Sequence, residues 1–260
     1  MIICKTQGGL GNQLFQWAYA RSLSVDFNLP FFLDLNFYNN QFGVTKRSFL
    51  LSKFKNINFN IFNGYNVNRL IRITDDFNYK KITYQENLNY YLDGYWQSEK
   101  YFKSNSDTIK KELSINEEDK SKFLSKYPEL LKKSVSIHVR RTDYVNQQHN
   151  HPLQTIEYYK NAINYIGEYN HLLIFSDDIN WCKENLEFSN MIFIENNDEI
   201  TDMQIMSLCT DNIIANSSFS WWGAWLNNNP NKKIVAPEKW FGQNLNLNTS
   251  DIIPENWLKI

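Results

Sequence analysis

The fold class is decided by the first 34 residues, MIICKTQGGLGNQLFQWAYARSLSVDFNLPFFLD (residues 1–34). Residues 1–6 predict a short buried strand, which runs directly into a glycine-rich turn at residues 8–11. From Asn12 to about Phe27 the apolar side chains recur at helical spacing, which predicts a helix. Residues 30–34 predict a second strand that ends in a carboxylate. A strand, a loop, a helix and a second strand in this order are typical of a parallel sheet.

The second half of the chain repeats this alternation more regularly, which favours a doubly wound α/β fold. We expect strands over residues 134–139, 172–175, 191–194, 212–215 and 233–236, and helices over 155–168, 179–186, 198–209 and 219–227. Residues 99–132 are expected to be helical, with Ser114 and Glu117 as a capping box. The Asn- and aromatic-rich residues 36–98 give no clear pattern. We therefore expect two α/β domains, residues 1–132 and residues 133–260.

The composition is that of a folded globular chain. Of the 260 residues, 42% are hydrophobic and 21% are charged, with 9 Gly and 6 Pro, which excludes a disordered or low-complexity chain. A net charge of −1 argues against a nucleic-acid-binding protein. Three cysteines without a CxxC spacing favour a reduced compartment. No apolar run is long enough for a signal peptide or a membrane span, so we expect a complete, soluble and cytoplasmic chain.

The loop after the first predicted strand is one candidate ligand site. Gly9 and Gly11 let a ligand approach the backbone, and the helix that starts near Asn12 offers free N–H groups. The third glycine of a dinucleotide fingerprint would fall at Leu14, so that fingerprint is incomplete. The loop is therefore either a tight turn without a ligand role or a site in which Asn12, a good N-cap, presents its amide to a ligand.

A stronger candidate is HVRRTD at residues 138–143, which follows the strand predicted over residues 134–139. In open α/β sheets, ligands bind outside the carboxyl ends of the strands. Arg140 and Arg141 are adjacent here, although the chain has only six arginines, and an arginine can hold a phosphate with two hydrogen bonds. His138 and Arg140 lie on the same face of the strand. Alternatively, Arg141 and Asp143 form an ordinary salt bridge.

Two further loops follow predicted strands. Residues 216–220 (NSSFS) place small hydroxyls at the start of a helix, which suits phosphate, although one serine alone could be a plain N-cap. Asp177 and Asp178 follow another strand, where a carboxylate either accepts hydrogen bonds from a nucleoside or caps the next helix. The tryptophans at 221, 222 and 225 are expected to lie mostly in the core. A metal site is not favoured, because no Asp-x-Asp motif occurs and His149 and His151 have no third ligand nearby, which predicts a solvated loop.

Four blocks in this order give a specific resemblance. They are GGLGNQLFQ at residues 8–16, GYWQSEKYF at residues 94–102, HVRRTDYV at residues 138–145, and ANSSFSWW at residues 215–222. Together they resemble the bacterial alpha-1,2-fucosyltransferases of glycosyltransferase family 11, and they span most of the chain.

The resemblance implies a GT-B-like fold, with two Rossmann-like α/β domains facing a cleft and the donor, GDP-fucose, bound mainly by the second half. By residue matching, Arg140 would contact the donor phosphate, and Asn12 would lie near the chemistry. The further substrate-binding residues would be Gly9, Gly11, His138, Arg141, Asp177, Asn216, Ser217, Ser218 and Phe219. Residues 36–98 would supply the acceptor side.

Such a transferase would move L-fucose from GDP-beta-L-fucose, with inversion, to the 2-hydroxyl of a terminal galactose on an oligosaccharide or a surface glycan such as lipopolysaccharide. Negative charge grows on the leaving GDP, and Arg140 with helix N-termini would neutralise it without a metal ion or a cofactor. Asp143 is a candidate base, but a poor one, because the neighbouring arginines stabilise its ionised form. Contact with a lipid-linked acceptor at the inner membrane would be peripheral.

Three other interpretations stay open. A related transferase would use another sugar nucleotide or make another linkage. A non-catalytic sugar-binding module would explain the 16% aromatic content through stacking on sugar rings, but not the phosphate-type loops. A dinucleotide oxidoreductase is a more distant alternative.

Overall fold

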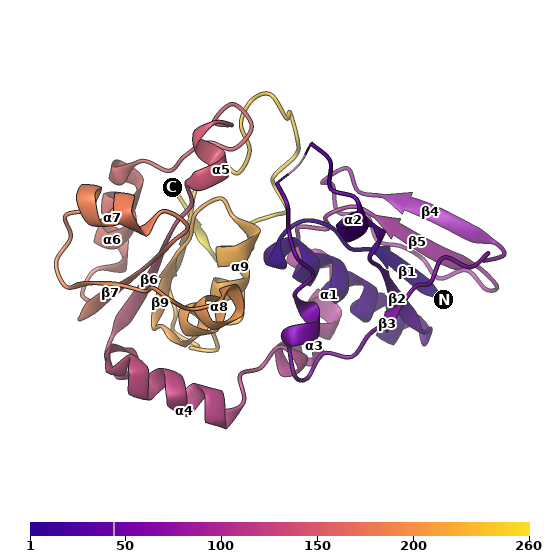
Figure 1. The fold of residues 1–260 in the computed structure, drawn as a ribbon, viewed down its shortest axis with the longest axis horizontal. Helices are drawn as coiled ribbons and strands as arrows, with labels where there is room; N and C mark the ends of the chain where they lie inside the picture. The colour runs from indigo at the N-terminus through magenta and orange to yellow at the C-terminus, as the bar shows by residue number, and fades with distance from the viewer. Residues whose placement is uncertain (44) are drawn as a thin grey trace. The chain divides into compact units, whose positions relative to one another are not determined.

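Two compact units make up the part of the chain that the computed structural model describes, residues 1–43 and 45–260 (Figure 1). Unit 1 contains Met1–Ser114 and Leu247–Pro254, and unit 2 contains Ile115–Asn246 and Glu255–Ile260. The boundary expected near residue 132 thus falls inside unit 2. The reason is that Tyr127 and Leu130 are buried in a core cluster of unit 2.

Unit 1 is built on a five-stranded sheet whose neighbouring strands are parallel. The strand order is β3-β2-β1-β5-β4. The strands are β1 (Ile2–Lys5), β2 (Phe31–Asp34), β3 (Asn60–Ile61), β4 (Leu70–Thr74) and β5 (Asn89–Asp93). The helices are α1 (Leu10–Phe27), α2 (Asn36–Asn39) and α3 (Ser106–Glu112), with the short 3-10 turns η1 (Leu51–Lys53), η2 (Glu99–Tyr101) and η3 (Lys103–Asn105).

The predicted start of the chain is confirmed by β1, α1 and β2. The strand β1 is central in its sheet, and Ile2, Ile3 and Cys4 are fully buried. The helix α1 packs along this sheet (Figure 1). Two glutamines on α1, Gln13 and Gln16, are also fully buried. Burial of an amide is tolerated where it is hydrogen-bonded. Gln13 Nε2 donates to the Gly8 carbonyl at 3.0 Å, and Gln16 Oε1 accepts from the Gln7 N–H at 2.9 Å, so both side chains bond to the loop after β1.

Unit 2 is built on a six-stranded parallel sheet in the order β11-β10-β9-β6-β7-β8. Its strands are β6 (Ser134–Val139), β7 (His171–Ser176), β8 (Met191–Phe193), β9 (Asp211–Ile213), β10 (Ile234–Ala236) and β11 (Leu258–Lys259). Its helices are α4 (Glu117–Lys126), α5 (Thr142–Val145), α6 (Ile156–Ile166), α7 (Ile179–Asn185), α8 (Glu199–Leu208) and α9 (Ser218–Trp225), with the 3-10 turn η4 (Pro128–Leu131). The doubly wound α/β prediction is therefore confirmed.

The sheet of unit 2 is covered on both faces, because side chains alternate along β7. Leu172 and Ile174 join a core cluster with Tyr159 of α6 and Cys182 of α7. Their neighbours Leu173 and Phe175 join a separate cluster with Ile205 and Met206 of α8 and with η4. Strands buried on both faces have nearly continuous apolar sequences, which is why this half was readable from the sequence.

The segment 247–254 connects unit 2 to its own last strand by way of unit 1. Asp251 in this segment accepts hydrogen bonds from the backbone N–H of Tyr79 (3.1 Å) and from Lys100 Nζ (2.5 Å). The chain then returns to unit 2, where Leu258 of β11 pairs with Val235 of β10. Residues near the end of the chain thus form hydrogen bonds within unit 1.

Some local predictions are wrong. The stretch 99–132 is helical, as expected, in the short elements η2, η3, α3, α4 and η4, but the capping box expected there is wrong. The N-cap of α4 is Asn116, whose Oδ1 accepts from the Asp119 N–H at 2.8 Å. Ser114, expected in a capping box, instead donates to the Lys111 carbonyl at 2.8 Å. The unassigned middle of the chain supplies three strands of unit 1, and the short β11 was also missed. Among the described residues, no helix combines the length and the apolar character that crossing a bilayer demands.

Candidate functional site

The carboxyl edge of the unit 2 sheet collects the candidate ligand residues of the second half. Counted from β6, the strand order corresponds to 3-2-1-4-5-6, the arrangement of dinucleotide-binding sheets. Its topological switch point lies between β6 and β9, where ligands of such sheets bind. The loop after β6 carries Arg140, and the loop after β9 leads into α9 through Ser217.

Arg140 is held by two carboxylates. Its Nη2 donates to Asp143 Oδ1 at 2.5 Å, and its Nη1 lies 3.0 Å from Asp177 Oδ2. Its guanidinium also lies over the Tyr144 ring, 5.2 Å from the centroid. The side chain is 18% exposed. A guanidinium has five N–H donors, so these two contacts do not use all of its donor capacity.

Arg141 has different partners from those expected. Its Nε donates to Asp178 Oδ2 at 3.1 Å, and its guanidinium stacks on Trp181, with 3.8 Å to the ring centroid. The predicted alternative of an Arg141–Asp143 salt bridge is therefore wrong in its partner, since Asp143 pairs with Arg140. Arg141 nevertheless forms an ordinary salt bridge, with Asp178 in place of Asp143.

The two aspartates after β7 have separate roles. Asp177 Oδ1 accepts from the Arg141 backbone N–H at 2.8 Å, and its Oδ2 accepts from the Thr142 hydroxyl. Asp177 therefore ties the end of β7 to the loop after β6. Asp178 is the N-cap of α7, where it accepts from the Trp181 N–H at 3.3 Å. The capping alternative thus applies to Asp178.

The N-terminus of α9 lies at the switch point with no acidic residue in its first turn. Ser217 is the N-cap by position, but its side chain makes no capping hydrogen bond. Ser218 and Phe219 begin the helix and are partly exposed. The first N–H groups of a helix have no partner inside the helix and attract anions. The tryptophans of α9 are buried, as expected.

Asn216 anchors the loop that precedes α9. Its Oδ1 accepts from Gln154 Nε2 and its Nδ2 donates to the Trp240 carbonyl, both at 3.0 Å. Its own carbonyl accepts from the Tyr144 hydroxyl at 3.1 Å. Both ends of the side-chain amide are therefore used within the protein, which favours a positioning role for Asn216 over direct ligand contact.

His138 is buried on the same edge, 5% exposed, with its ring 5.5 Å from that of Phe219. Its Nδ1 is buried and has no hydrogen-bond partner among the described residues. Burial lowers the pKa of His138 to about 4; the Arg140 cation adds to this effect, and the Asp177 carboxylate opposes it. His138 is therefore a neutral imidazole at pH 7, with an unpaired polar atom beside the arginine.

This depressed pKa makes the stability of the protein depend on pH. The unfolded chain takes up a proton at His138 near pH 6.5, whereas the folded chain does so only near pH 4. Between these values the unfolded state binds more protons, so stability falls as the pH falls. From pH 7 to pH 5 we expect His138 to contribute a loss of about 2 kcal/mol in the free energy of unfolding.

The measurement is urea unfolding of the wild type and of His138→Gln at pH 7 and pH 5. Between pH 7 and pH 5, the free energy of unfolding should fall by about 2 kcal/mol less in the variant than in the wild type. Groups that titrate in the same way in both proteins do not contribute to this difference. Equal losses in the two proteins would show that His138 is not buried in its neutral form.

His151 is a site residue that the sequence analysis missed. It was expected in a solvated loop, but its ring stacks on Tyr144 at 4.7 Å and 19° and packs against Phe241. The loop is held by main-chain bonds, including Gly242 N–H to the Asn150 carbonyl at 2.8 Å. Burial and the Arg140 cation lower the pKa of His151, with Asp143 opposing. The aromatic Tyr144, three positions after the arginine pair, was the available signal.

In unit 1, the loop after β1 needs glycine at a position not singled out from the sequence. Gly8 has φ +80°, and a Cβ there would lie 2.7 Å from Asn12 Nδ2. Gly9 is the N-cap of α1 with an ordinary φ of −78°, and Gly11 is buried in the helix. Asn12 is partly exposed in the first turn of α1. The close approach that excludes a side chain is thus at Gly8.

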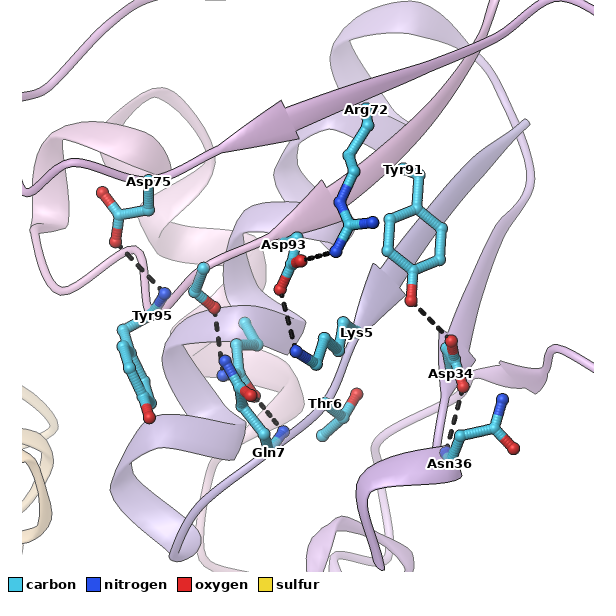
Figure 2. A network of polar contacts seen from close by, with 12 residues as sticks. Lys5, Thr6, Gln7, Asp34, Asn36, Arg72, Asp75, Tyr91, Asp93 and Tyr95 are labelled. Atoms are coloured by element: carbon cyan, nitrogen blue, oxygen red, sulfur yellow. Dashed lines mark hydrogen bonds and ion pairs between the residues drawn. The ribbon is translucent and has the colours of Figure 1, made fainter.

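Charged residues line the carboxyl edge of the unit 1 sheet (Figure 2). Lys5 Nζ lies 3.1 Å from Asp93, which also pairs with Arg72. Burial alone would raise the pKa of Asp93, but hydrogen bonds from Arg72 and Lys5 outweigh it and hold this pKa below its ordinary value. At the end of β2, Asp34 accepts a hydrogen bond from the Tyr91 hydroxyl of β5 at 2.6 Å. In the described residues, no group of three or more His, Cys, Asp or Glu side chains is placed to hold a metal ion.

Comparison with known proteins identifies relatives along the whole chain. The model of the family described as glycosyl transferase family 11 matches residues 47–260. An alpha-1,2-colitosyltransferase of Escherichia coli is 35% identical, covering 100% of this chain and 99% of that protein. The O-antigen biosynthesis glycosyltransferase WbnK of Escherichia coli is 31% identical, covering 97% of this chain and 98% of that protein.

Among solved structures, the NodZ alpha-1,6-fucosyltransferase soaked with GDP-fucose has a TM-score of 0.51 at 13% identity. The match covers 86% of this chain and 91% of that chain. NodZ co-crystallised with GDP gives a TM-score of 0.50 at 12% identity, covering 85% of this chain and 90% of that chain. At this identity the likeness concerns the fold, which is GT-B-like, as the resemblance implied.

Proposed function

Because the chain belongs to glycosyl transferase family 11 and is therefore a glycosyltransferase, we propose that it transfers L-fucose from GDP-beta-L-fucose to the 2-hydroxyl of a terminal galactose. The acceptor would be an oligosaccharide or a surface glycan, and the reaction would invert the anomeric carbon. We assign donor binding to unit 2 and acceptor binding to unit 1.

The arrangement of Arg140 supports this proposal most directly. Breaking the bond between fucose and GDP leaves negative charge on the β-phosphate, which a preorganised cation stabilises. Asp143 and Asp177 contact the guanidinium of Arg140 through different nitrogens, and its other N–H donors would bind phosphate oxygens. The N-terminus of α9, with Ser217 and Ser218, supplies further donors at the same switch point. In this scheme Asp143 is a positioning residue, because its carboxylate is engaged by the cation.

The remaining residues of the proposed donor site are assigned by their surroundings. His138 and Phe219 pack together beside Arg140, and a neutral imidazole can donate to a nucleotide oxygen. Arg141 and Asn216 hold the loops that carry these residues. In unit 1, Asn12 with the loop Gly8–Gly11 would face the reacting sugar.

A donor screen tests the function. Purified protein is incubated with lactose as acceptor and one donor at a time: GDP-fucose, GDP-mannose or UDP-galactose. The release of nucleotide and the linkage of the product are measured. We expect GDP-fucose to give a 2-linked fucosyl product. Transfer from a UDP-sugar alone would overturn the proposal, and sugar binding without any affinity for GDP would favour a non-catalytic module.

A second donor is favoured by one observation, the 35% identity to an alpha-1,2-colitosyltransferase over the whole chain. The same screen therefore includes GDP-colitose. A higher kcat/KM for this donor than for GDP-fucose would make the protein a colitosyltransferase with the same 1,2 linkage.

We also expect transfer to proceed without a divalent metal ion. The chain has no Asp-x-Asp motif, and Arg140 with the start of α9 can take the role of the cation in neutralising GDP. Turnover in about 5 mM EDTA should equal turnover in the same buffer without the chelator. Activity that disappears in EDTA and returns with manganese would contradict this.

A further inference from the structure

The two loops at the switch point of the unit 1 sheet are joined by one side-chain hydrogen bond. The strand order β3-β2-β1-β5-β4 puts the switch point between β1 and β5. The loop after β1 leads into α1, whose first turn carries Asn12, and the loop after β5 carries Gln97. Gln97 Nε2 donates to Asn12 Oδ1 at 2.8 Å, although the residues are 85 positions apart.

A dedicated turn holds Gln97 in place. Asp75 accepts hydrogen bonds from the backbone N–H groups of Tyr95 at 3.1 Å and Trp96 at 2.7 Å (Figure 2 shows the first of these). Trp96 is held at φ +55°, a left-handed conformation that is costly for a bulky residue. Buried Gln16 donates to the Gly94 carbonyl at 3.1 Å and so ties the same turn to α1. The backbone around Gln97 is thus fixed on both sides.

The bond from Gln97 determines how the Asn12 amide is turned. Because Asn12 Oδ1 accepts from Gln97, its Nδ2 points the other way, and no described residue of the chain accepts a hydrogen bond from that Nδ2. Asn12 is partly exposed, so this N–H₂ group is available as a donor. Gln97 Oε1, in contrast, is buried and has no partner among the described residues. A buried acceptor without a partner costs free energy. A role for Gln97 Nε2 in orienting Asn12 would explain why a glutamine is retained at this position.

We propose that Gln97 is a positioning residue for Asn12. It holds the Asn12 amide so that Nδ2 donates to an oxygen of the sugar that unit 1 binds, and Asp75 supports it by fixing the turn. The proposal rests on the proposed function, in which Asn12 faces the reacting sugar, and it adds that the donor character of Asn12 is imposed by a residue from another loop.

Gln97→Glu tests this through pH. Above the pKa of the new carboxyl group, the carboxylate can only accept, so it attracts Asn12 Nδ2 and turns Oδ1 toward the ligand. Below that pKa the carboxyl group again donates to Oδ1. Because an ordinary glutamate has a pKa of about 4.3, the ratio of variant to wild-type kcat should be about 10-fold lower at pH 7.5 than at pH 4, with a smaller change in KM. A ratio that is constant with pH would overturn the proposal.

Two controls separate positioning from a general structural role. Gln85→Glu makes the same change at an exposed position and should give a ratio that does not vary with pH. In a double-mutant cycle, Gln97→Ala should lower kcat in the wild type but should have less than about a 2-fold effect in an Asn12→Ala background. Effects that multiply in the double variant would show that Gln97 does not act through Asn12.

A measurement without turnover keeps the test independent of the proposed function. The side-chain NH₂ resonances of Asn12, assigned by their loss in Asn12→Asp, should shift with pH in Gln97→Glu and stay constant in the wild type over the same range. A shift in a protein that transfers no sugar from any donor would leave the positioning intact and overturn the proposed function. Resonances that do not follow the pH in the variant would overturn the positioning itself.

Discussion

Arg140→Lys is expected to lower kcat by at least about 100-fold while the protein stays folded. Lysine keeps the positive charge but has a compact ammonium group in place of the planar fork. In the wild type, Arg140 donates to Asp143 and pairs with Asp177 through another nitrogen, and it has five N–H donors in all. An ammonium has three donors in total, so two carboxylates would leave it only one. Stabilisation of the leaving phosphate would then be largely lost although the charge is conserved.

The measurement is single-turnover transfer from the donor that the screen identifies, with the dissociation constant of GDP determined in parallel. Arg21→Lys is the matched control, because Arg21 also pairs with a carboxylate, that of Glu112, and lies in the C-terminal half of α1 in unit 1. It should retain wild-type turnover. If Arg140→Lys turns over within a few-fold of the wild type, Arg140 has no part in leaving-group stabilisation.

Gly94→Ala is expected to lower the free energy of unfolding by about 3 kcal/mol. A Cβ at this position would lie 2.1 Å from Asp75 Cβ and 3.1 Å from the Asp75 backbone nitrogen. The methyl group can be accommodated only if Asp75 moves, and Asp75 accepts hydrogen bonds from the backbone of Tyr95 and Trp96. The substitution therefore adds a steric clash and removes bonds that hold the turn.

Chemical unfolding of Gly94→Ala measures this loss. Gly9→Ala serves as the comparison for stability, since a Cβ at Gly9 would meet Arg47 only at 3.8 Å and the backbone there has φ −78°. It should cost less than about 1 kcal/mol. Similar losses for both variants would mean that the packing of Asp75 against Gly94 does not constrain the turn.

The sequence predicted the second half of the fold better than the first for a physical reason. Strands such as β6 and β7 are buried on both faces, so their sequences are continuous apolar runs. The strand β4 lies at an edge of its sheet and is largely exposed, and β3 has only two residues. Such strands carry no periodic signal, so residues 36–98 could not be assigned.

The candidate site was predictable where the chemistry lies in one local motif. The loop after β6 could be placed at a strand end from the pattern of residues 134–143 alone. The partners of its arginines could not be predicted, because Asp177 and Asp178 lie in the loop after β7, and Asp178 is 37 positions from Arg141. The same applies to Asp75 and Gln97, which act through contacts between loops that are far apart in the sequence.

The path of the last 14 residues has a consequence for dividing the protein into fragments. The segment 247–254 contributes Asp251 to unit 1, while β11 belongs to the sheet of unit 2. A single cut between residues 114 and 115 therefore leaves an N-terminal fragment without the partner of Lys100 and Tyr79. Expressed separately, that fragment should be more susceptible to proteolysis near Tyr79 than the intact chain. Addition of a peptide spanning residues 247–254 should restore its resistance, so complementation of the fragment in trans would report on this segment.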